Sequence, residues 1–106
     1  MEIELDAFSG RPNPTWTLSE SKGSRLLERI ASLPEANDVP HPPGLGFRGF
    51  VVRSGDRSIR VFGGRVVSEG PGPVKIYRDT AGVLNELAED ARERGFEDVV
   101  GGSSRR

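Results

Sequence analysis

The segment 8–16, Phe-Ser-Gly-Arg-Pro-Asn-Pro-Thr-Trp, concentrates side chains that could bind a ligand. Arg11 could hold a carboxylate or phosphate through two parallel hydrogen bonds, Asn13 could orient the ligand, and Trp16 could supply an aromatic wall. The two prolines exclude a regular helix, because proline removes an amide donor and clashes with the preceding turn. Stiff loops with polar side chains are common functional sites. The competing interpretation is structural: asparagine before proline starts turns, and the tryptophan would anchor the loop in the core.

A second pair of candidates, Phe47 and Arg48, lies in the segment 46–50, Gly-Phe-Arg-Gly-Phe. Gly49 predicts a bulge or a close backbone approach. Arg48 could then join Arg11 in a corner that binds an anion. The alternative is the start of an edge strand with a solvent-facing arginine.

These two segments together resemble a group of small proteins of unknown function. Members open with a strand and a Phe-Ser-Gly-Arg-Pro-Asn-Pro-x-Trp segment, and they carry a Gly-aromatic-Arg-Gly-Phe segment later in the chain. The resemblance implies a shared fold. It implies no activity, no cofactor and no catalytic residue.

His41 is the only histidine of the chain and stands between two prolines in the long connection 34–46. An imidazole titrates near neutral pH and could act as an acid, a base or a metal ligand. No partner at a characteristic spacing accompanies it, so an exposed loop histidine is the simpler interpretation. The chain has no cysteine, which excludes disulfides, thiolate nucleophiles and cysteine-bound metals. We therefore expect neither a metal nor a cofactor.

The charge balance narrows the range of partners. The chain has 15 Lys and Arg residues and 16 Asp and Glu residues, whereas nucleic-acid-binding proteins usually have a basic excess. The same balance argues against binding to an anionic membrane surface. The N-terminus lacks the features of a signal peptide, and no apolar run approaches the length of a membrane span. We expect a soluble, cytoplasmic protein that binds a protein or peptide segment or a small anionic molecule.

Apolar residues at helical spacing predict two helices. Ser19 or Ser21 would cap the first helix, which would end at Pro34 because the residue before proline disfavours helix. Asp79 or Thr80 would cap the second.

Alternation of apolar and polar residues predicts strands in the rest of the chain. The first covers 2–8, and its acidic side chains would pair across strands with Arg53 or Arg60. A later hairpin would turn at Gly55-Asp56. Its expected register places Val52 opposite Ile59 and Phe50 opposite Val61.

Together these elements predict an α+β fold, a two-layer sandwich in the order β-α-β-β-β-α. Two helices would cover a mainly antiparallel sheet of four to five strands. Residues 1–100 would form a single globular domain, followed by a flexible tail at 101–106. The residues expected on the uncovered, partly solvated face of the sheet are Arg53, Arg60, Lys75 and Tyr77.

The leading functional hypothesis is a small non-catalytic binding or accessory protein. It would hold a partner segment or a small anionic ligand through the loops 9–16 and 40–48. One alternative is a small enzyme with His41 as acid or base, in which Arg11 and Arg48 bind an anionic substrate. Another is a structural subunit that forms a homodimer through an edge of its sheet.

Overall fold

The computed structural model describes residues 1–7, 12–39 and 48–100 of the 106-residue chain. These ranges contain six strands and three helices. In chain order they are β1 (Glu2–Asp6), β2 (Thr15–Thr17), α1 (Glu20–Ala31), β3 (Gly49–Ser54), β4 (Arg57–Phe62), β5 (Arg65–Glu69), β6 (Lys75–Arg78), α2 (Val83–Glu93) and α3 (Glu97–Val100).

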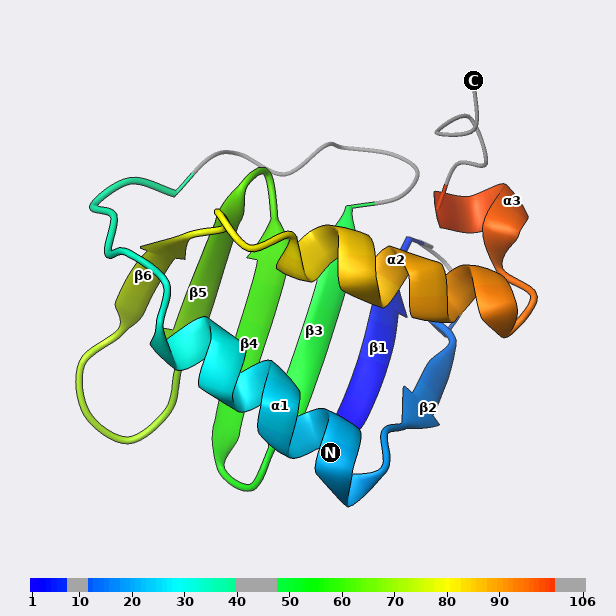
Figure 1. The fold of residues 1–106 in the computed structure, drawn as a ribbon, viewed down its shortest axis with the longest axis horizontal. Coiled ribbons are helices and arrows are strands. Elements are labelled where there is room, and N and C mark those ends of the chain that lie inside the picture. The colour runs from blue at the N-terminus through cyan, green and yellow to red at the C-terminus, as the bar shows by residue number, and fades with distance from the viewer. Residues whose placement is uncertain (8–11, 40–47, 101–106) are drawn as a thin grey trace.

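The strands form one antiparallel sheet in the order β2-β1-β3-β4-β5-β6, and α1 and α2 cross one of its faces (Figure 1). The predicted α+β class and antiparallel sheet are confirmed. The predicted four to five strands and two helices are too few. The extra elements are short: β2 has three residues and α3 has four, so neither carries a periodic signal long enough to recognise.

The central hairpin of β3 and β4 has the predicted register. Val52 lies opposite Ile59, and Phe50 lies opposite Val61. The turn that joins these two strands contains Gly55. Its φ of 61° is in the left-handed region that glycine adopts without strain. Because side chains alternate along a strand, all four apolar residues then share the face that the helices cover.

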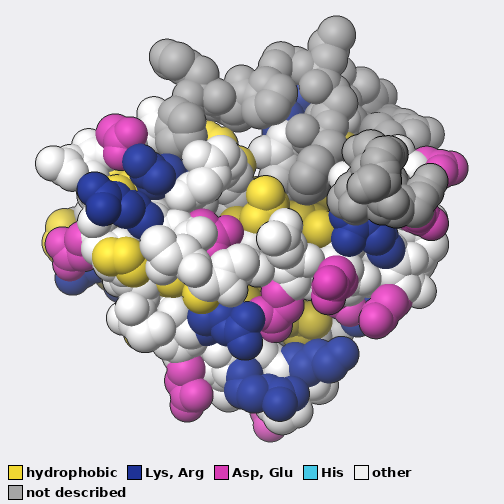
Figure 2. All heavy atoms as spheres, turned by 45° about the horizontal axis from the view of Figure 1, so that its top comes forward, with side chains coloured by type: hydrophobic (Ala, Val, Ile, Leu, Met, Phe, Trp, Pro, Cys, Tyr) yellow, Lys and Arg dark blue, Asp and Glu magenta, His cyan; other side chains and the backbone are white. Residues whose placement is uncertain are grey.

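Both long helices are capped, and their outer sides carry mixed charge (Figure 2). Ser19 caps α1 as predicted, because its Oγ accepts the backbone N–H of Lys22 at 3.3 Å. Helix α2 begins later than the predicted cap, at Val83. Asp79 still serves its start, since its carboxylate oxygens accept the N–H groups of Val83 at 2.7 Å and of Leu84 at 2.9 Å. A carboxylate at this position also suits the positive end of the helix.

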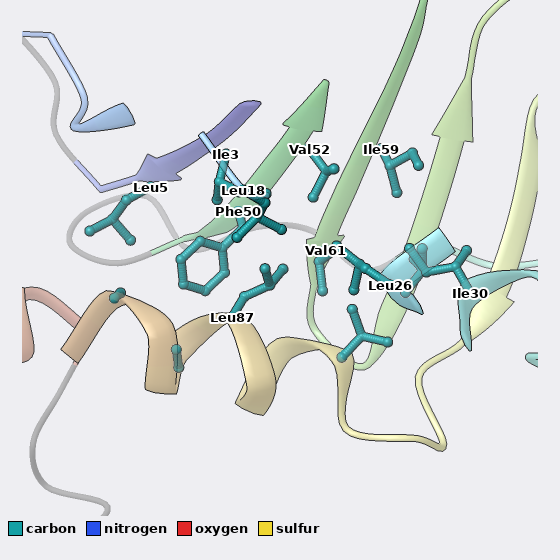
Figure 3. Close-up of a cluster of buried hydrophobic side chains, with 14 of the residues drawn as sticks. Ile3, Leu5, Leu18, Leu26, Ile30, Phe50, Val52, Ile59, Val61 and Leu87 are labelled. Carbon is teal, nitrogen blue, oxygen red and sulfur yellow. The ribbon is translucent and has the colours of Figure 1, made fainter. Parts of the chain in front are cut away.

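The hydrophobic core fills the space between the sheet and the helices (Figure 3). Strand side chains point there toward Leu26 of α1 and Leu87 of α2, and both leucines are buried. The largest fully buried side chains are Phe50, Ile3, Leu5, Leu26, Val52, Val61, Val66, Val67 and Val83.

Strand β6 presents the opposite face from the one expected. Tyr77 lies opposite Val66 of β5 and packs, partly buried, against the core. Lys75 alternates with Ile76 and therefore shares the face of Tyr77. The prediction that both residues lie on the uncovered face is wrong, because pairing with β5 fixes the side toward which each residue points.

The acidic side chains of β1 pair across strands as predicted. Arg53 Nη1 lies 2.7 Å from Glu4 Oε1 and 3.7 Å from Glu2 Oε1. Arg60, the other predicted partner, instead approaches Glu69 Oε2 at 3.8 Å. These pairs place acidic and basic side chains beside each other on the uncovered face of the sheet.

Gly49, at the start of β3, allows the close backbone approach that its position in the sequence suggests. Its φ is 133°, and an added Cβ would lie 2.3 Å from the carbonyl oxygen of Val61 and 2.8 Å from Cβ of Phe62. Glycine is therefore required here for two independent reasons, backbone conformation and space.

We expect Gly49→Ala to lower the free energy of unfolding by about 3 kcal/mol or more, because the clash is with backbone that cannot move aside. Gly64→Ala is the matched control, since Gly64 has a φ of 80° with nothing within 4 Å of an added Cβ. The control should lose only about 1–2 kcal/mol, the cost of the backbone conformation alone. Urea denaturation measures both, and equal losses would contradict the steric explanation.

Candidate functional site

Of the predicted binding residues, the structure describes Asn13, Trp16 and Arg48, and it places Trp16 on a different face of the sheet from the other two. Arg11, His41 and Phe47 lie outside the described residues. Trp16 lies opposite Ile3 on the face that the helices cover, and its side chain is buried. Asn13 and Arg48 contact the acidic side chains of β1, which alternate onto the other face.

Asn13 fastens the Pro-Asn-Pro segment to β1. Its Oδ1 accepts the backbone N–H of Ala7 at 3.1 Å, and its Nδ2 donates to Glu4 Oε2 at 2.8 Å. This hydrogen bond is the main reason why the pKa of Glu4 is lowered; partial burial opposes it, and Arg53 adds to it. The carboxamide thus braces the loop from inside the protein.

Trp16 connects the first strands to the C-terminal part of the chain. Its Nε1 donates to Asp90 Oδ2 of α2 at 2.8 Å. Its ring stacks on Phe96 with centroids 5.7 Å apart and meets Phe50 edge-on at 6.4 Å. The guanidinium of Arg94 lies 5.3 Å from the ring centroid. The indole therefore contacts four side chains of the protein, and a ligand contact for Trp16 stays a prediction.

Arg48 is held against the end of β1. Its Nε and Nη2 lie 3.2 and 3.1 Å from Asp6 Oδ1, and its backbone N–H donates to the Asp6 carbonyl at 2.8 Å. Only 19% of the Arg48 side chain is exposed, so Arg48 is not the solvent-facing arginine of the alternative interpretation. The guanidinium is positioned by both main chain and side chain.

Arg60, which the sequence analysis did not select as a binding residue, lies beside this pair. It lies in the middle of β4, and its guanidinium carbon is 5.3 Å from the centroid of the Phe62 ring. Among the described residues, Arg60 Nε is buried without a hydrogen-bond partner. The spacing Arg60-x-Phe62 was the available signal, because residues two apart on a strand share a face.

A small cavity joins these residues on the uncovered face of the sheet. It has a volume of about 40 Å³. Its lining is formed by Asp6, Arg48, Phe50, Val51, Arg60, Val61 and Phe62. Two guanidinium groups against one carboxylate give the cavity a net positive charge, so its chemistry suits an anion.

The edges of the sheet leave little backbone for pairing with another chain. Beside β6, the N–H of Ala36 donates to the Ile76 carbonyl and the N–H of Arg78 donates to the Pro34 carbonyl, both at 2.8 Å. The opposite edge strand, β2, has only three residues. Short and covered edges disfavour pairing between sheets. A homodimer formed through a sheet edge stays a prediction.

Comparisons with known proteins found no matching family, no matching curated protein and no matching solved structure. In the described ranges no helix is long and apolar enough to cross a membrane. The same residues contain no group of three histidine, aspartate or glutamate side chains placed to hold a metal ion. The chemistry of the site residues is therefore the basis for assigning a function.

We expect Asn13→Ala to lower the free energy of unfolding by about 2 kcal/mol at pH 7, since it removes two hydrogen bonds, one of them to a charged group. Because the pKa of Glu4 is lowered in the folded protein, this stabilisation is present above the ordinary carboxyl range and is lost as the pH falls through the folded pKa. The difference in the free energy of unfolding between Asn13→Ala and the parent protein should therefore become smaller at acidic pH.

The exposed Asn85 of α2 provides the control, and Asn85→Ala should stay within about 0.5 kcal/mol of the parent. Denaturant titrations between pH 7 and pH 3 measure both variants. A difference for Asn13→Ala that is the same at every pH would contradict the link to the Glu4 carboxylate.

Proposed function

We propose that this protein is a non-catalytic binding protein that holds the anionic end of a ligand between Arg48 and Arg60. The ligand group is a carboxylate or a phosphate, carried by a small molecule or by a segment of a partner. The proposal keeps Arg48 from the predicted 40–48 loop. It replaces Asn13 and Trp16, whose polar groups bond to other parts of the protein.

The buried Nε of Arg60 is the observation that carries this proposal. Among the described residues it has no acceptor, although its burial removes it from water. A buried donor without a partner costs stability, and a bound anion would supply the missing acceptor. Glu69, the acid nearest to Arg60, approaches only Nη2 and only to 3.8 Å, which is too far for a hydrogen bond.

The volume of the cavity limits what it can take. About 40 Å³ accommodates one small anionic group rather than a whole metabolite. The rest of the ligand would therefore lie outside the cavity. Arg60 can present parallel N–H groups to such an anion, which is the geometry that favours arginine over lysine at carboxylate and phosphate sites, and Arg48 adds a second positive charge.

The site is built on parts of the sheet that cannot easily move. The ring of Phe62 lies under the Arg60 guanidinium, and Asp6 fixes Arg48. The backbone contact at Gly49 brings the end of β4 against the start of β3, which places Phe62 close to Arg48. Preorganised cations lose little side-chain entropy when they bind.

Binding rather than catalysis is the role that the lining residues favour. Of the seven, Asp6 is the one carboxylate, and Arg48 already holds it. The other six are arginine, phenylalanine and valine residues, which supply charge and shape.

Titration with inorganic phosphate and, separately, with acetate at low ionic strength tests the proposal by ¹H–¹⁵N chemical shifts. We expect saturable shifts around the cavity, and Arg60→Gln should weaken binding about tenfold, the effect of losing a charge-assisted hydrogen bond. The tighter of the two ions identifies the natural anionic group.

Arg78→Gln is the control, because Arg78 lies on the edge strand β6 and does not line the cavity. It should leave the affinity unchanged. Absence of saturable shifts with both ions, or equal affinities for the parent and Arg60→Gln, would overturn the proposal.

A further inference from the structure

A larger cavity lies on the opposite side of the molecule, in the groove between α1 and α2. Its volume is about 340 Å³, within the range of about 300–1,000 Å³ that is usual for small-molecule sites. The groove is on the helix layer of the fold (Figure 1). Arg60 lies opposite Val51, on the face of the sheet turned away from the helices. The groove is therefore independent of the anion site.

The two walls of this groove carry opposite charges. Helix α1 contributes Lys22 and Arg25, and helix α2 contributes Glu89 and Glu93. Among the described residues, none of the four forms an ion pair within 4.0 Å. Opposite charges thus face each other without meeting.

The groove is closed at one end and open at the other. At the closed end, Arg29 Nη1 of α1 lies 2.6 Å from Glu86 Oε1 of α2. The axes of the two helices diverge from this end toward the other (Figure 1). The four unpaired charges line the open part, where the helices are too far apart for a direct bridge.

The helix dipoles reinforce the separation of charge. The two helices run in opposite directions, so the positive N-terminal half of α1 flanks the negative C-terminal half of α2 (Figure 1). Lys22 lies in the first turn of α1, and Glu93 ends α2. Each charge has the same sign as its own helix end, so it adds to the field across the groove.

The floor between these walls is apolar. It is formed by Leu18, Leu26 and Leu87, which also belong to the core. An aliphatic chain that lies on this floor loses contact with water. The groove thus combines a cationic wall, an apolar floor and an anionic wall, in that order.

We propose that this groove binds a small zwitterion whose ammonium and carboxylate groups are separated by an aliphatic chain. The carboxylate contacts Lys22 and Arg25, and the ammonium contacts Glu89 and Glu93. The chain between them lies on the leucines. A molecule with both charges satisfies both walls, whereas a molecule with one charge leaves the other wall unpaired.

A titration with 6-aminohexanoate tests this inference, with hexanoate and hexylamine as analogues that each keep a single charge. Chemical shifts of α1 and α2 should saturate with 6-aminohexanoate, which should bind about tenfold more tightly than either analogue. Arg25→Gln and Glu89→Gln should each weaken its binding about tenfold. Both side chains are exposed, so circular dichroism should show both variants folded.

Glu28→Gln is the matched control, because Glu28 is an exposed acid of α1 that does not line the groove. It should bind 6-aminohexanoate like the parent, and so should Arg60→Gln, which separates this site from the anion site. All affinities are read from the shifts of α1 and α2, because carboxylates can also bind at Arg60. The inference is overturned if these shifts do not saturate, if hexanoate or hexylamine binds to the groove as tightly as the zwitterion, or if Arg25→Gln and Glu89→Gln leave this affinity unchanged.

Discussion

The indole of Trp16 joins the first strands of the sheet to the C-terminal part of the chain. It donates a hydrogen bond to Asp90 of α2, stacks on Phe96 between α2 and α3, and meets Phe50 of the central strand β3 edge-on. Because β2 has only three residues, backbone pairing with β1 alone holds it weakly. The ring thus adds side-chain contacts that link the edge of the sheet to the last turns of α2 and to the residue before α3.

Local patterns in the sequence predict the parts of the fold that local interactions determine. The hairpin register around Val52 and Ile59 follows from a short turn and an apolar alternation, both readable within a dozen residues. The face of the sheet on which Tyr77 lies does not follow from such a local pattern. It is decided by the pairing of β6 with β5 across a glycine- and proline-rich connection. The elements β2 and α3 have only three and four residues, too few to carry a periodic signal of their own.

The residues of the candidate site are even harder to predict from local sequence patterns. From the sequence, Arg48 is a candidate anion ligand, Gly49 predicts a bulge or a close backbone approach, and Arg60 is expected only to pair with acidic side chains. Asp6 and Arg48 are 42 residues apart, and Trp16 and Asp90 are 74 apart, so the fold alone brings each pair together. These distant partners decide which residues of the N-terminal motif support the fold and which remain available for ligands.

Hydrogen exchange of the indole N–H of Trp16 tests most directly whether this residue is structural. The chain has one tryptophan, so its indole resonance is unambiguous. If the ring is buried and bonded to Asp90, this hydrogen should exchange as slowly as the backbone amides of β3, because both need the same global opening. Exchange as fast as that of a free indole, in a protein whose β3 amides remain protected, would contradict the account.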